Sequence, residues 1–166
     1  MRSYLAKLAF ICAAWHFWSA TATKHGIIGM GINMYRPFCC NACTDSLSPL
    51  FLNCTIIMDS VGTTSPACRA SSGPWLQTLA YCFKQECAAD GLSNVEIQTC
   101  WNTMAAQGDE VSPYEHWIPA VAPSVRVSAS AIWLNATSLV NQKLYHVTRL
   151  SYEEWEYEED MHSRLA

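Results

Sequence analysis

Cysteine is the residue type whose number and spacing could support chemistry in this chain of 166 residues. Nine cysteines are present, and four of them lie between Cys39 and Cys54, in the stretch FCCNACTDSLSPLFLNCT. A thiol can bind a metal ion, act as a nucleophile or form half of a disulfide. The redox state of the compartment decides which of these roles applies.

The N-terminal residues have the three-part pattern of a secretory signal peptide. Two basic residues come first, an apolar run of eleven residues follows, and small residues at Ala20 and Ala22 offer a cleavage site after Ala22. The alternative is a retained membrane anchor, but the run is shorter than the roughly 20 residues that a membrane-spanning helix needs. We therefore expect residues 1–22 to be a signal peptide and the mature chain to be extracellular. Sequons at Asn53 and Asn135 agree with export and are candidate glycosylation sites.

Export makes disulfides the expected use of the thiols. Cys12 lies inside the predicted signal, which leaves an even number of cysteines in the mature chain. Their spacing leaves the pairing open. A zinc cluster is the alternative, but no matched pair of C-x2-C motifs is present, and the adjacent Cys39 and Cys40 suit tetrahedral ligation poorly. The predicted four disulfides use Cys39, Cys40, Cys43, Cys54, Cys68, Cys82, Cys87 and Cys100.

Composition and missing motifs argue against two classes of function, nucleic-acid binding and catalysis. Removing Arg2 and Lys7 with the signal leaves eight basic and fourteen acidic residues, a net charge of minus six. A secreted acidic chain without a basic patch is not expected to bind nucleic acid. No G-x-S-x-G or H-E-x-x-H motif is present, so this chain alone is not expected to be catalytic.

The periodicity of apolar residues predicts a mainly α fold, a small disulfide-rich helical domain over residues 23–108. We expect about three short helices, over 42–58 with an interruption at Pro49, over 73–87, and over 93–108. The third has a capping box and an inward face, and the second has a first-turn proline. The stretch DSVGTTSPACRASSGP, residues 59–74, is expected to form a loop pinned by Cys68 up to the start of the second helix. In the third helix the capping box is formed by Ser93 and Glu96, and the residues expected to face inward are Val95, Ile97, Cys100 and Met104.

The C-terminal part has a different character. Residues 109–150 are expected to be an irregular extension with one strand near 126–137, and residues 151–166 an acidic, membrane-proximal helix. An acidic run of this kind can be a solvated helix face, or it can attract cations.

Three stretches carry a resemblance to a known family. They are GIIGMGINMYRPFCCNACTDSLSPLFLNCT, TSPACRASSGPWLQTLAYCFKQEC and WLNATSLVNQKLYHVTRLSYEEWEYEED. Together they resemble the extracellular N-terminal region of fungal ferric reductases, which are membrane flavocytochromes related to NADPH oxidases. The resemblance implies a head domain linked to reductive iron uptake, with the membrane reductase domain or ferric chelates as partners. Under this resemblance the candidate metal ligands for ferric iron are the carboxylates, which hard cations prefer, of Glu153, Glu154, Glu158 and Glu159. Haem and FAD would belong to the transmembrane and cytosolic parts of such a protein, and no cofactor is expected in this chain.

A second resemblance gives an alternative function. The spacing C-x4-C-x12-C at Cys82, Cys87 and Cys100 is similar to the end of the fungal CFEM domain, a secreted module whose members include haem binders. The D-x-x-C-x-C element of that domain is absent here. Asp45 and Asp59 are the acids that could contact iron under this alternative, and Asp59 is the better candidate.

Overall fold

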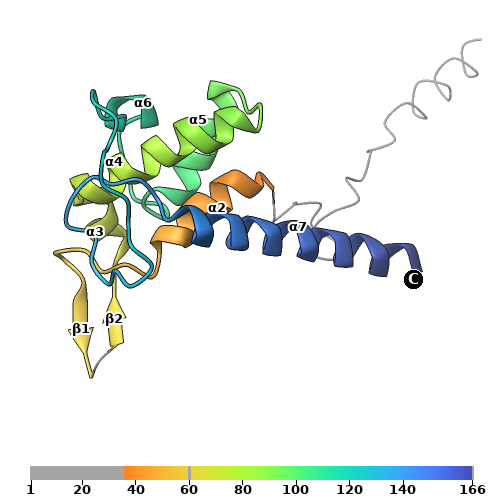
Figure 1. The fold of residues 1–166 in the computed structure, drawn as a ribbon, viewed down its shortest axis with the longest axis horizontal. Helices are drawn as coiled ribbons and strands as arrows, with labels where there is room; N and C mark the ends of the chain where they lie inside the picture. Colours follow the sequence, from red (N-terminus) through yellow and green to blue (C-terminus); the bar gives the residue numbers. More distant parts are fainter. Residues whose placement is uncertain (1–35, 60, 166) are drawn as a thin grey trace, which may run out of the picture. The chain divides into compact units, whose positions relative to one another are not determined.

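The computed structural model describes residues 36–59 and 61–165, with backbone only at the end of the last helix. The predicted signal peptide and residues 23–35 lie outside this part. The described chain is a small, mainly α, disulfide-rich domain, as predicted (Figure 1). Its elements are α2 (Phe38–Leu47), β1 (Ile56–Met58), β2 (Val61–Thr63), α3 (Pro66–Ser71), α4 (Gly73–Cys82), the π-helix η2 (Phe83–Cys87), α5 (Asn94–Met104), α6 (Tyr114–Trp117) and α7 (Gln142–Leu165).

The prediction of a first helix over 42–58 is wrong at both ends. Helix α2 begins at Phe38, directly after Pro37, whose carbonyl accepts from the backbone N–H of Cys40 at 3.1 Å. It ends at Leu47 because Pro49 has no N–H to continue the helical hydrogen bonds. The cysteines of FCCNAC are therefore helical, whereas Cys54 lies in a turn.

Residues 56–63 form an antiparallel β-hairpin where helix and loop were predicted. Ile56 pairs with Thr63, Ile57 with Gly62 and Met58 with Val61. The turn begins at Asp59, which has a φ of 49°, a left-handed conformation that Asp adopts more readily than most residues. β-Branched side chains fit this pleated geometry better than a helix.

The second predicted helix is confirmed. Ser72 caps α4 by accepting from the backbone N–H of Trp75 at 3.4 Å, and Pro74 stands in the first turn, where its missing N–H costs nothing. Beyond Cys82 the chain continues without a break as η2, so the helical rod reaches Cys87 as expected.

The third predicted helix and its capping box are also confirmed. The Ser93 Oγ accepts from the backbone N–H of Glu96, and a Glu96 carboxylate oxygen accepts from the backbone N–H of Ser93 at 2.8 Å. Ile97 and Cys100 are buried, but Val95 is 76% exposed and was wrongly assigned to the core. Its place is taken by Trp101, which is fully buried.

The C-terminal helix begins earlier than predicted. Helix α7 starts at Gln142 rather than near residue 151, and it runs as one helix to Leu165 alongside α2 (Figure 1). The strand expected over 126–137 does not form. Residues 118–141 are irregular and are held by two isolated bridges, Phe51 to Trp133 and Arg126 to Leu139.

Two buried tryptophans join the helices into one core. The indole N–H of Trp75 donates to the Ala105 carbonyl at 2.7 Å, and that of Trp101 donates to the Ser112 carbonyl at 2.8 Å. Phe83 packs edge-to-face on Trp101, with ring centroids 6.2 Å apart. Because the indole donors are satisfied, these large side chains can be buried without loss of a hydrogen bond.

Candidate functional site

Helix α2 carries three of the four disulfides. Its cysteines bond to the helices beside it, as Cys39 to Cys87, Cys40 to Cys100 and Cys43 to Cys82. The fourth bond, Cys54 to Cys68, ties the residues before the hairpin to α3. The predicted four-disulfide framework is confirmed, and the structure supplies the pairing that spacing left open.

The π-helix η2 makes two of these bonds possible side by side. Cys39 and Cys43 are four residues apart on α2 and point to nearly the same side. Their partners Cys87 and Cys82 are five residues apart, which in a regular α-helix would turn the two side chains well away from each other. The wider turn of η2 between them brings both to the face that meets α2.

The bonded cysteines form a compact cluster of sulfur atoms. The Cys40 Sγ lies 3.6 Å from the Cys87 Sγ and 3.9 Å from the Cys39 Sγ, and all three residues are fully buried. Three sulfurs within 4.8 Å of one another are close enough to share a metal ion as thiolates. Each is instead bonded in a disulfide, so none is available as a ligand or a nucleophile in this state.

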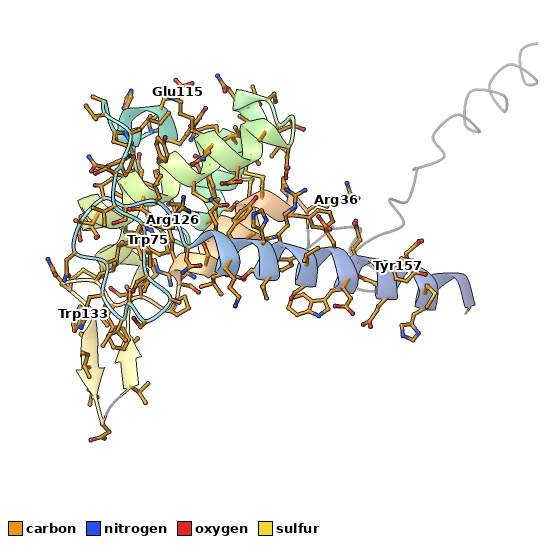
Figure 2. All side chains as sticks on the ribbon, in the orientation of Figure 1. Arg36, Trp75, Glu115, Arg126, Trp133 and Tyr157 are labelled. Carbon is orange, nitrogen blue, oxygen red and sulfur yellow. A yellow bond between two sulfur atoms is a disulfide. The ribbon has the colours of Figure 1, made fainter. Side chains whose placement is uncertain are left out.

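Helix α7 is attached to the rest of the described domain by charged and aromatic contacts. Arg36 forms a two-point ion pair with Glu156, at 2.7 Å and 3.0 Å, and lies beside α7 (Figure 2). This hydrogen bond raises the pKa of Arg36. Arg149 binds Asp90 at 2.7 Å and Glu153 at 3.0 Å. The pairs Arg36–Glu156 and Arg149–Asp90 join α7 to the cysteine domain, whereas Arg149–Glu153 lies within the helix.

Two tyrosines on the same face of α7 complete this contact. Tyr145 is fully buried, and burial, with the nearby charge of Glu86, raises its pKa to about 12. The Tyr152 hydroxyl donates to the Asp45 carboxylate on α2, and burial together with this bond raises the pKa of Tyr152. Sequence reasoning missed this face, although the seven-residue spacing of Tyr145 and Tyr152 is the helical signal that indicates it.

The four predicted metal ligands do not converge. Glu153 is paired with Arg149, Glu159 is half-buried, and Glu154 and Glu158 are exposed on α7. Within the described ranges, the group of three cysteines is the only convergent set of possible ligands. An iron site made of these carboxylates stays a prediction, and one helix alone does not offer ligands from several directions.

The other predicted site residues lie on the surface. Asn53 and Asn135 are both exposed, so their side-chain amides are accessible for glycosylation. Thr55 of the first sequon uses its hydroxyl to accept from the backbone N–H of Leu52 at 2.7 Å. Of the two candidate iron contacts, Asp45 is engaged by Tyr152, whereas Asp59 stands exposed at the hairpin turn.

A buried cation is a further feature that the sequence did not indicate. Arg69 of α3 is 8% exposed, and its guanidinium lies 4.7 Å from the Trp75 ring centroid. Burial lowers the pKa of Arg69, and the charge of Asp45 opposes this shift. The contact with Trp75 is a cation–π interaction that fixes α3 on α4.

Comparison of the chain with family models, curated proteins and solved structures finds no match. Among the described residues, no helix combines the length and the apolar character that crossing a membrane requires. The cysteine framework and the docked helix α7 are therefore the features on which a function can be argued.

Proposed function

We propose that this chain is the non-catalytic extracellular head of a ferric reductase-like membrane protein and serves reductive iron uptake without carrying electrons itself. The observation that carries the proposal is the use of every cysteine between residues 39 and 100 in disulfides around one helical core. A cysteine in a disulfide has no free thiolate to act as a nucleophile or a metal ligand. Such a core suits a rigid module outside the cell, where disulfides persist.

The acidic helix supports a place for this head near a membrane domain that handles iron. One face of the helix contacts α2 through Tyr152 and Arg36 through Glu156, which attaches α7 to the head. Glu154 and Glu158 of the same helix are exposed to solvent. Exposed carboxylates raise the local concentration of ferric ions and cationic chelates. In such a protein the haem and FAD would lie in the membrane and cytosolic parts.

The test is the coding sequence downstream of the Ala166 codon, read from the transcript. We expect an open frame that continues into apolar spans with paired histidines, the ligands that hold haem between membrane helices. A stop codon directly after Ala166 would contradict the proposal. The chain would then be a freestanding secreted module.

The β-hairpin favours a second candidate function, haem capture by a module similar to the CFEM domain. Ile56, Met58 and Val61 share one face of the hairpin and are 64%, 69% and 67% exposed. Asp59 stands at the turn next to this apolar face. A haem could pack its apolar ring on such a face while a carboxylate approaches its iron.

Haem titration of the purified chain, followed by absorption, tests this second candidate. Asp59→Asn should weaken binding at least about tenfold, because it removes the anionic iron ligand. Asp109→Asn is the matched control, since Asp109 is exposed elsewhere on the surface. An absence of binding by the wild-type chain, or equal affinity in both variants, would eliminate haem capture at the hairpin.

A further inference from the structure

Helix α7 has a second stripe, on the face opposite Tyr145 and Tyr152, in which exposed apolar residues stand between charged ones. The docking face carries Tyr145 and Tyr152, whereas Val147 and Leu150 point to the other side and are 55% and 61% exposed. The stripe repeats at steps of four and three residues, which is the spacing of a coiled-coil seam. The outer stripe consists of Lys143, Val147, Leu150, Glu154, Tyr157 and Met161.

An apolar groove continues the outer stripe onto the domain surface. The groove has a volume of about 330 Å³ and is bordered by Leu144 and Val147 of α7, by Leu50 after α2 and by Val127 of the irregular segment. Lys143 lies at its edge. Contiguous exposed apolar surface of this kind marks an interaction site more often than isolated exposed residues do.

The charges in the outer stripe identify the occupant. Lys143 is exposed at the N-terminal end of the stripe, and Glu154 is exposed three turns later. Neither forms an ion pair within the described residues, unlike Arg149 and Glu153 on the docking side. We propose that the outer stripe binds the outer stripe of a second copy of this chain, with the two α7 helices antiparallel.

The antiparallel register gives each of the first four residues of the outer stripe a suitable partner. Lys143 of each copy faces Glu154 of the other, and Val147 faces Leu150, so two ion pairs enclose two apolar layers. Pairing by a twofold axis makes these contacts reciprocal. In the antiparallel orientation the positive end of each helix dipole also lies near the negative end of the other, which is favourable. Tyr157 and Met161, which are 64% and 46% exposed, extend the apolar surface beyond these layers.

A parallel pairing would bring like charges together. In that arrangement Lys143 meets Lys143 and Glu154 meets Glu154, and like charges at neighbouring helix positions are destabilising. A basic helix from another protein would match Glu154 but would be repelled by Lys143. The order of charges along the stripe therefore favours self-association over both alternatives.

Sedimentation velocity of the full secreted chain over a concentration series tests the proposal. The wild-type chain should form a reversible dimer. Lys143→Glu and Glu154→Lys should each weaken dimerisation at least about tenfold, because either change turns two attractive pairs into two repulsive ones. The double variant with both changes restores opposite charges in each pair and should dimerise like the wild type.

Lys84→Glu is the matched control. Lys84 is exposed on η2 and is not part of the outer stripe, so its reversal changes the net charge equally and should leave dimerisation unchanged. A wild-type chain that stays monomeric at every concentration would overturn the proposal. So would a dimer that Lys143→Glu leaves intact, because it would associate through another surface or in parallel.

Discussion

The adjacent cysteines of α2 show how much depends on single residues in this core. Cys39 and Cys40 bond to different helices, yet the Cys40 Sγ lies only 3.6 Å from the Cys87 Sγ of the neighbouring disulfide. A free thiol at this position would be in reach of a bond that it can attack.

Cys100→Ser creates such a thiol at Cys40. We expect its thiolate to attack Cys87, form a Cys40–Cys87 bond and release Cys39, so that the variant is a mixture of two disulfide isomers. Alkylation of free thiols followed by peptide mass mapping would find label on both Cys39 and Cys40.

Cys68→Ser provides the control for this exchange. It frees Cys54, which lies outside the sulfur cluster, so a single labelled position is expected. Label confined to Cys40 in Cys100→Ser would contradict the exchange.

The capping box of α5 predicts a pH dependence at the residue scale. Hydrogen bonds from the Ser93 backbone and hydroxyl lower the pKa of Glu96 below its ordinary value of 4.5. Because the folded-state pKa is lowered, the contribution of this carboxylate to stability is present above pH 4.5 and is lost as the pH falls through the folded-state value.

Thermal melts of Glu96→Gln measure this contribution. The variant should melt below the wild type near neutral pH, and the difference should shrink towards zero as the solution is acidified below pH 4.5. Glu110→Gln, at an exposed position outside the box, should melt like the wild type throughout. A difference that does not vary with pH would show that the charge of Glu96 does not contribute to stability.

At the scale of elements, the hairpin is positioned by a close contact that only glycine permits. A Cβ at Gly62 would lie 2.3 Å from the Phe51 ring, which packs edge-to-face on Trp133 at a centroid distance of 5.4 Å. Figure 2 shows Trp133 at the root of the hairpin. Gly62→Ala must therefore displace Phe51 and lower the melting temperature, with a changed tryptophan emission.

Gly73→Ala controls for the loss of backbone freedom. No atom lies within 4 Å of a Cβ built at Gly73, so this variant should keep the wild-type emission. Equal behaviour of the two variants would contradict the proposed packing of Phe51 on the hairpin.

The attachment of α7 depends mainly on Tyr145. Its side chain is fully buried, and truncating a large aromatic side chain in a core typically costs about 3–5 kcal/mol. Tyr145→Ala should lose about this much free energy of unfolding in denaturant titration. Tyr157→Ala removes an aromatic ring of the same helix that is 64% exposed and should have little effect. Similar losses in both variants would show that α7 is not held by its docking face.

Sequence reasoning predicted those elements whose local signals agree with their packing. The capping box at Ser93 and the first-turn proline at Pro74 defined α5 and α4 because each satisfies backbone groups within its own helix. The apolar spacing after Pro49 is compatible with either a helix or a strand over short runs, so the hairpin was missed. Helix α7 was predicted too short because its first turns depend on contacts with α2, which are distant in sequence.

At the scale of the whole molecule, the pairing of the cysteines could not be predicted from their spacing. The pairs join residues 14 to 60 positions apart, and which sulfurs meet depends on how α2 crosses the rod formed by α4 and η2. The number of disulfides was predicted from an even cysteine count in a chain that was expected to be exported. The partner of each cysteine follows only from the fold, which includes the π-helix η2 that no pattern in the sequence predicted.

The central claim is that the eight cysteines from Cys39 to Cys100 all form this one set of four bonds, and disulfide mapping of the purified protein tests it most directly. Non-reducing digestion with electron-transfer fragmentation can separate the bonds of adjacent Cys39 and Cys40. We predict no free thiol among these residues and the pairs 39–87, 40–100, 43–82 and 54–68. A free thiol at any of the eight, or Cys39 bonded to Cys100, would contradict the account.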